Sequence, residues 1–159
     1  MTPKALTKTS PAVETVGSLL IAYSEVTKEL NAQLIADHGL SMNEYEVLLL
    51  LSKADKMRMR RTDLAQQVRL SPSGITRMLN RLEDTGLVEK GDCESDARIT
   101  YAVLTKAGIT KLKECAPDNM AAIDSHLAAR LSKEEIETLR ELLGRFFEGD
   151  ADCGIGEDA

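Results

Sequence analysis

The sequence predicts a mainly α-helical protein with one small β-hairpin, organised as a single domain. Apolar residues recur at helical spacing over residues 13–37 and again toward the C-terminus, which predicts long helices on both sides of the middle of the chain. Between them, residues 61–105 contain two short helical patterns and then two alternating segments separated by a polar tip. A length of 159 residues, with 43% hydrophobic and 29% charged, is typical of a soluble globular protein.

The first long helix is predicted over residues 13–37. Its apolar residues are three, four or seven positions apart and therefore share one face. Gly39 is predicted to end this helix, because glycine readily adopts the left-handed conformation that terminates helices. The apolar positions are Val16, Leu20, Tyr23, Leu30 and Leu34.

The second helix is predicted from Met42 to about Ala54. Ser41 and Glu44 have the spacing of a capping box, in which each side chain bonds the backbone N–H of the other residue. The helix contains four consecutive leucines at 48–51, which must be buried nearly all round.

Two helices joined by a short turn are predicted next. Thr62 is expected to cap the first of them, which runs to about Val68. Ser71 is expected to cap the second, with Pro72 in the first helical position, where its missing N–H costs nothing.

The second of these helices has one apolar face, formed by Ile75, Met78, Leu79 and Leu82. The outward face carries hydroxyl, amide and guanidinium groups, with no acidic residue before Glu83. Its residues are Ser73, Thr76, Arg77, Asn80 and Arg81.

A β-hairpin is predicted directly after this helix. Gly86 ends the helix, Leu87 to Lys90 forms one strand, and Ala97 to Leu104 forms the other, with Ile99, Tyr101 and Val103 alternating. The tip spans residues 91–96 and includes Cys93. Arg98 lies just past the tip, where a guanidinium can enter a minor groove of DNA, and Asp96 on the same side of the strand can orient it by a charge-assisted pair.

Two further helices are predicted after the hairpin. Thr105 caps a helix that starts at about Lys106, is broken or kinked at Pro117, and resumes from Asp118 to about Arg130. A second capping box, Ser132 to Glu135, starts the last helix. The apolar residues of that helix are Ile136, Leu139, Leu142, Leu143, Phe146 and Phe147.

The order helix, turn, helix and hairpin predicts a winged helix-turn-helix, a fold that reads DNA. Hydroxyl, amide and guanidinium groups contact phosphates and base edges, and the N-terminal half of the second helix fits the major groove. An ordinary solvated helix face would show the same periodicity. The hairpin that follows favours the DNA-binding interpretation.

The chain resembles the MarR family of transcriptional regulators. The resemblance rests on RLEDTGLVEK at 81–90, on Asp96-x-Arg98, on Leu104-Thr105-x-x-Gly108, and on a long helix on each side of the module, and it spans roughly residues 12–148. It implies a homodimer that binds a palindromic operator in double-stranded DNA, usually as a repressor released by a small molecule or an oxidant. The DNA contacts it implies are Ser71, Ser73, Thr76, Arg77, Asn80, Arg81 and, in the wing, Arg98.

The predicted organisation has five parts. Residues 1–11 form a flexible N-terminus, 12–40 an N-terminal dimerisation helix, 41–108 the winged helix-turn-helix domain, 109–148 the C-terminal dimerisation helices, and 149–159 a flexible acidic tail. Apolar stripes on the terminal helices exceed what the central module can cover, which favours a second subunit over packing within one chain.

Charge is separated along the sequence. The net charge is −6, yet residues 56–113 contain 12 Lys and Arg against 7 Asp and Glu. This distribution predicts a basic DNA-facing region on an acidic body. A chance fluctuation of surface charge is the alternative.

A small-molecule effector is also expected. The resemblance implies an aromatic or phenolic ligand in a cleft between the DNA module and the dimerisation helices, with Tyr23, His38, Tyr45 and Lys111 as candidates. The alternative roles are a helix C-terminal cation for His38 and packing for the two tyrosines. With no tryptophan and no cysteine before Cys93, the chain lacks the residues used by the urate-responsive and peroxide-sensing relatives.

Other classes of function are disfavoured. No nucleotide-binding or hydrolase motif is present, so an enzyme is not expected, and neither a cofactor nor a metal site is predicted. The chain has three cysteines without metal-like spacing, as expected of reduced thiols in the cytoplasm. It contains no signal peptide and no apolar run long enough to span a membrane. We therefore expect a cytoplasmic protein with no membrane partner. Two alternatives remain: an activator or protein-interaction module without ligand control, and a redox-responsive repressor that uses Cys93.

Overall fold

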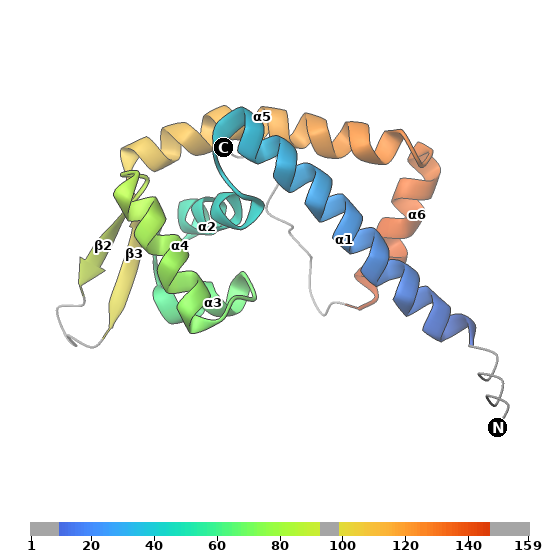
Figure 1. Cartoon of the computed structure of the whole chain (residues 1–159), viewed down its shortest axis with the longest axis horizontal. Helices are drawn as coiled ribbons and strands as arrows, with labels where there is room; N and C mark the ends of the chain where they lie inside the picture. The colour runs from blue at the N-terminus through green and yellow to red at the C-terminus, as the bar shows by residue number, and fades with distance from the viewer. Residues whose placement is uncertain (1–9, 93–98, 147–159) are drawn as a thin grey trace, which may run out of the picture.

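The computed structural model describes residues 10–92 and 99–146 and confirms a mainly helical fold with one small sheet. Figure 1 shows the short helices and the sheet gathered beneath one end of the long helix α5, while α1 and α6 extend away from them. In chain order the elements are α1 (Pro11–His38), α2 (Met42–Lys53), the 3₁₀ turn η1 (Asp55–Met57), β1 (Arg58–Arg60), α3 (Arg61–Gln67), α4 (Pro72–Asp84), β2 (Val88–Asp92), β3 (Thr100–Leu104), α5 (Lys106–Ala128) and α6 (Lys133–Gly144).

Helix α1 ends at the predicted glycine cap, and it begins at a serine cap that was not predicted. The side chain of Ser10 accepts a hydrogen bond from the backbone N–H of Val13, and Pro11 occupies the first turn, so the helix begins two residues before the predicted start. Gly39 ends it with φ 70°, as predicted.

The capping box of α2 is confirmed. Ser41 Oγ accepts a hydrogen bond from the backbone N–H of Glu44, and the Glu44 carboxylate accepts one from the backbone N–H of Ser41. Leu48 and Leu51 are fully buried, whereas Leu49 and Leu50 are only half-buried against the core. The leucine run is therefore buried on one side more than on the other, and less completely than predicted.

The predicted cap of α3 is wrong. The helix begins at Arg61, its N-cap residue is Arg60, and no side chain caps it. Thr62 lies inside the first turn, where its hydroxyl donates to Asp63 Oδ1. The reason is the strand β1, which runs directly into the helix and keeps Arg60 in an extended conformation.

Helix α4 starts and ends as predicted. Ser71 Oγ accepts a hydrogen bond from the backbone N–H of Gly74 over 3.1 Å, and Pro72 occupies the first turn. Three of the four predicted apolar positions are buried, and Met78 is half-buried. Gly86 follows with φ 72°, which turns the chain toward β2.

The sheet has three strands rather than the predicted two. β1 pairs antiparallel with β3, and β3 with β2, in the order β1-β3-β2. A three-residue strand with two arginines gives almost no sequence signal, which explains why β1 was missed. In β3, Ala102 and Leu104 form the buried face, while the predicted alternating residues Tyr101 and Val103 are half-buried on the other.

A break or a kink was predicted at Pro117; helix α5 runs through that residue without interruption, so the break is wrong. Proline removes one backbone donor and leaves the carbonyl four residues earlier without its helical partner. Both Pro117 and Lys113 are exposed, so water can satisfy that carbonyl and the helix continues. Thr105 caps α5 as predicted, and Ser132 and Glu135 form the second predicted capping box at the start of α6.

One hydrophobic core fills the space between α2, α3, α4, the sheet and the first half of α5. Helix α1 contributes only Leu30 and Leu34 to the buried residues, and α6 contributes none. Within residues 10–92 and 99–146, no helix combines the length and apolar character that crossing a membrane requires.

Candidate nucleic-acid interface

The outward face of α4 forms an open groove with a volume of about 490 Å³. Of the six DNA contacts predicted on this helix and its cap, five line the groove together, and the sixth, Ser71, lies just before it as the N-cap. The lining residues are Ser73, Thr76, Arg77, Asn80, Arg81 and Asp84. Asp84 was not among the predicted site residues, although its position one turn after Asn80 places it on the same face.

The hydroxyl groups at the start of α4 are oriented by local hydrogen bonds. Ser71 Oγ lies 3.1 Å from Ser73 Oγ, and Thr76 Oγ1 donates to the carbonyl of Pro72 over 2.7 Å. Because the Thr76 proton is used within the helix, its oxygen faces the groove as an acceptor.

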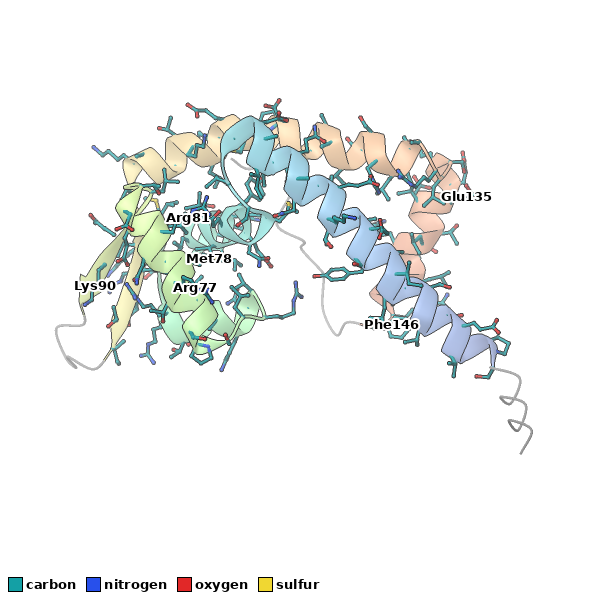
Figure 2. The ribbon with its side chains drawn as sticks, viewed as in Figure 1. Arg77, Met78, Arg81, Lys90, Glu135 and Phe146 are labelled. Atoms are coloured by element: carbon teal, nitrogen blue, oxygen red, sulfur yellow. The ribbon has the colours of Figure 1, made fainter. Side chains whose placement is uncertain are left out.

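Arg77 is a groove residue whose guanidinium has no partner within the described residues. Its side chain is exposed, and within the described residues it forms no ion pair or hydrogen bond. Figure 2 shows it near the middle of α4. All five N–H donors of its guanidinium are therefore available to an anionic or acceptor-rich partner.

Arg81 is only partly free. Its Nε lies 3.1 Å from Glu44 Oε1, and its Nη2 donates to the carbonyl of Gly39 over 3.3 Å. The side chain is still 62% exposed, so it lines the groove while it contacts Glu44 and Gly39.

Of the two acids at the end of α4, Glu83 is neutralised within the fold. Arg61 Nη2 forms a hydrogen bond and ion pair with Glu83 Oε1, and both side chains are largely buried. The pair connects α3 with α4, and it removes an unpaired negative charge from the neighbourhood of the groove.

Further basic groups lie on the strands, outside the residues predicted to contact DNA. The guanidinium of Arg58 on β1 stacks over the ring of Tyr101 on β3, 4.9 Å from its centroid. Lys90 on β2 is exposed. The strand pairing that brings Arg58 to Tyr101 is a long-range feature, so no local signal could have identified it.

The predicted wing contacts belong to the segment between β2 and β3. Asp96, Arg98 and the alternative redox residue Cys93 lie outside the described residues. The strands that lead to them, β2 and β3, are paired through to Asp92 and Thr100.

The four effector candidates differ in burial and in their partners. Tyr45 is 3% exposed in the core, and burial raises the pKa of its hydroxyl. Tyr23 is 62% exposed on α1. His38 pairs with Asp118 on α5, with 3.0 Å between Nε2 and Oδ2, and Lys111 is half-buried in the first half of α5.

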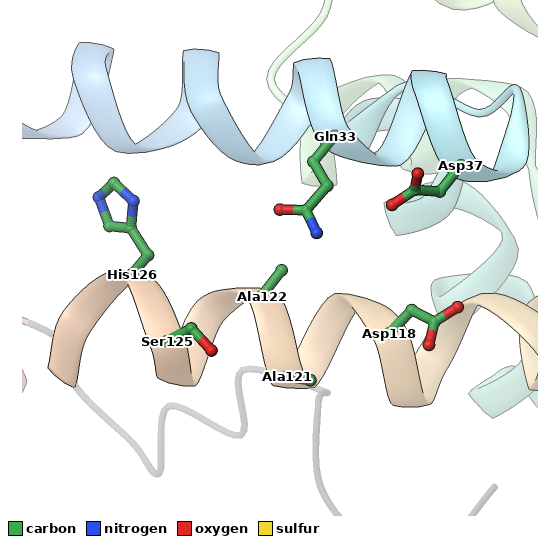
Figure 3. Close-up of a pocket in the computed structure, with 7 residues that line it drawn as sticks. All are labelled: Gln33, Asp37, Asp118, Ala121, Ala122, Ser125 and His126. Atoms are coloured by element: carbon green, nitrogen blue, oxygen red, sulfur yellow. The ribbon is translucent and has the colours of Figure 1, made fainter. Parts of the chain in front are cut away.

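A different cleft lies between α1 and α5, with a volume of about 580 Å³. Figure 3 shows Gln33 and Asp37 of α1 facing Asp118, Ala122 and His126 of α5. Ala121 and Ser125 complete the lining. Sequence reasoning missed this set because its members come from two helices about 85 residues apart and no one of them is unusual alone.

Histidine–carboxylate pairs connect α1 and α5 at both ends of this cleft. His38 and Asp118 lie at one end, and His126 Nδ1 lies 2.8 Å from Glu29 Oε2 at the other. Within the described residues, no group of three or more His, Cys, Asp or Glu side chains is arranged to hold a metal ion.

The fold and the groove of α4 define a winged helix-turn-helix protein of the DNA-binding class. A model of the MarR family matches residues 40–100. The HTH-type transcriptional regulator MhqR of Bacillus subtilis is 33% identical over 125 residues, which cover 78% of this chain and 83% of MhqR. The HTH-type transcriptional repressor YetL of the same organism is 28% identical over 133 residues, covering 82% of this chain and 79% of YetL.

The same family appears among solved structures. Sco3205, a MarR family transcriptional regulator from Streptomyces coelicolor solved in complex with DNA, matches with a TM-score of 0.76 and 27% identity, over 92% of this chain and 96% of its own. The chain belongs to the MarR family. It is a DNA-binding transcriptional regulator and not an enzyme.

Proposed function

We propose that the protein is a homodimeric repressor that binds a palindromic operator through the outward face of α4. The observation that carries this proposal is the groove of α4, in which hydroxyl, amide and guanidinium groups line one exposed helix face. Two such helices, one from each subunit, would enter successive major grooves about 34 Å apart. Each half of the palindrome would then meet an identical set of side chains.

Three groove residues, Ser73, Arg77 and Asn80, have roles that match groups of DNA. Arg77, with all its donors free, suits bidentate recognition of a guanine, and Asn80 suits an adenine. Ser71 and Ser73 lie at the N-terminus of α4, where hydroxyls and backbone N–H groups favour a phosphate. Arg98 of the wing is proposed to enter the flanking minor groove, oriented by Asp96.

Dimerisation is supported by the apolar residues that α1 and α6 leave exposed. A monomer would expose these side chains to water, whereas a second subunit would bury them. They are Val13, Val16, Leu19, Leu20, Ile21 and Tyr23 on α1, and Leu139 and Leu142 on α6, with Phe146 just after it.

Repression is the proposed outcome of DNA binding. The relative YetL is named a repressor. A dimer that occupies one face of the duplex over two helical turns would exclude polymerase from an overlapping promoter. Activation, or a protein-interaction role without ligand control, would be favoured instead if promoter activity rose or did not respond when the protein was supplied.

Release is proposed to follow from a small ligand in the cleft between α1 and α5. Asp37 and Asp118 are exposed there without a lysine or arginine in the lining. A neutral phenol could donate its hydroxyl proton to either carboxylate, whereas an aromatic acid would meet like charge. A ligand that preferred a different spacing of α1 and α5 would shift the dimer away from the DNA-binding state.

The proposal is tested by fluorescence anisotropy with a labelled fragment of the DNA upstream of the protein's own gene, titrated over salt with non-specific competitor. Saturable binding that survives competitor, with a salt slope near −0.9 per neutralised phosphate, is expected. Weak binding that competitor abolishes would contradict autoregulation at that fragment. Selection from random duplex DNA would then show whether the protein recognises any sequence.

A further inference from the structure

Glu44 makes more contacts than its capping role requires. Its Oε2 accepts hydrogen bonds from the backbone N–H and from Oγ of Ser41, each over 2.8 Å. Its Oε1 lies 3.1 Å from Nε of Arg81 on α4. Its side chain is only 4% exposed. One carboxylate oxygen therefore caps α2, and the other contacts Arg81 on α4.

Arg81 is held on one edge and free on the other. The contact to Glu44 uses Nε, and the hydrogen bond from Nη2 to the carbonyl of Gly39 uses a second donor. The remaining N–H groups belong to a side chain that lines the groove beside Arg77 and Asn80. The planar guanidinium is thus fixed in direction before any DNA arrives.

The second capping box of the chain shows what capping alone needs. Glu135 accepts a hydrogen bond from the backbone N–H of Ser132 over 2.8 Å, the same distance as in the first box. Glu135 is exposed at the start of α6, far from α4 in Figure 2, and within the described residues no cation pairs with it. The contact between Glu44 and Arg81 is therefore not a requirement of the capping box.

We propose that Glu44 is a positioning residue for DNA recognition. It orients Arg81 so that its free donors face the duplex, and it ties α4 to the corner where α1 ends and α2 begins. Orienting Arg81 in the free protein lowers the entropy cost of ordering it on DNA. The inference rests on DNA binding by α4 and is independent of palindromy, repression and ligand release.

Loss of the Glu44 charge and loss of Arg81 positioning should change the DNA affinity in opposite directions. Glu44 is a negative charge near a polyanion, so its neutralisation alone should strengthen DNA binding. Glutamine keeps an oxygen to cap α2, as the capping-box pattern allows, but loses the charge that fixes Arg81. If positioning dominates, Glu44→Gln weakens binding.

The experiment measures affinity for a duplex that the wild-type protein selects from random DNA, by anisotropy, for Glu44→Gln, Arg81→Ala, the double variant and the matched control Glu135→Gln. We expect Glu44→Gln to weaken binding about three- to tenfold, which is the cost of ordering one long side chain. The double variant should bind as Arg81→Ala does, because Glu44 acts through Arg81. Glu135→Gln should bind as wild type.

A DNA-free measurement separates this proposal from DNA binding itself. The ¹H–¹⁵N signal of Arg81 Nε should exchange slowly with water in the wild type and in Glu135→Gln, and rapidly in Glu44→Gln. Unchanged or tighter DNA binding by Glu44→Gln, or additive losses in the double variant, would overturn the proposal. Fast exchange in the wild type would overturn it too, even if no DNA sequence were selected. If Glu44→Gln unfolds, the exchange rate of Arg81 Nε in the wild type still tests the proposal.

Discussion

Gly108, in the first turn of α5, packs directly against the backbone carbonyl of Leu87, which follows the turn after α4. The approach is fixed by Thr105, whose Oγ1 accepts from the backbone N–H of Gly108 over 3.0 Å and donates to the carbonyl of Gly86 over 2.7 Å. The pattern Leu104-Thr105-x-x-Gly108 thus has a physical basis. It joins the start of α5 to the end of the DNA-facing helix with no room for a side chain.

Gly108→Ala should destabilise the protein by about 1–3 kcal/mol, the usual cost of an added group in a packed site. A Cβ at this position would overlap the carbonyl oxygen of Leu87 and lie 2.6 Å from Cδ1 of Leu104. Urea unfolding followed by circular dichroism measures the change. Gly144→Ala is the control, because a Cβ there meets nothing within 4 Å. Equal midpoints for Gly108→Ala and wild type would contradict the packing described.

Arg77→Ala should weaken binding to the selected duplex by about 1–3 kcal/mol, as expected for loss of one good base contact. Its stability should stay unchanged, because Arg77 has no partner within the described residues. Anisotropy and thermal melting together check both parts. Lys133→Ala on α6 removes the same charge away from the groove and serves as the control. A drop in melting temperature without a loss of affinity would assign Arg77 a structural role.

Leu20→Glu should convert the proposed dimer into a monomer. Leu20 is 64% exposed on α1, and a carboxylate at that position would be unpaired in an apolar interface. Light scattering should then give a mass near 17.4 kDa for the variant and near twice that value for the wild type. Gln66→Glu on α3, which adds the same charge outside α1 and α6, should remain dimeric. A wild-type mass that stays at the monomer value at all concentrations would reject the dimer.

Cys115 should resist alkylation until the protein unfolds. It is fully buried, and burial raises the pKa of its thiol, so little of the reactive thiolate forms near neutral pH. Iodoacetamide labelling followed by peptide mass spectrometry should show slow modification in the native protein and fast modification in urea. Equal rates in the two conditions would show that the core around α5 opens readily.

Local signals predicted most of the helical fold. The caps at Ser41, Ser71, Thr105 and Ser132 are each set by a side chain and a backbone group three residues apart, so the sequence contains all that is needed. The errors have long-range causes. β1 exists only because β3 pairs with it, and its presence moves the start of α3 away from Thr62.

The same distinction applies to the candidate site. Helical periodicity was sufficient to place Thr76, Arg77 and Asn80 on one exposed face. It could not show that Arg81 would be shared with Glu44, since the two residues are 37 positions apart and meet only in the folded chain. The cleft between α1 and α5 was not predicted for the same reason, since it is formed by residues that carry no signal alone.

Hydroxyl-radical footprinting on the selected duplex tests the central claim most directly. A dimer that places two α4 helices in successive major grooves should protect two patches related by twofold symmetry, with centres about 10 base pairs apart on one face of the DNA. Arg77→Ala should weaken both patches equally. A single protected patch, or protection without symmetry in the selected sequence, would contradict recognition by paired α4 helices.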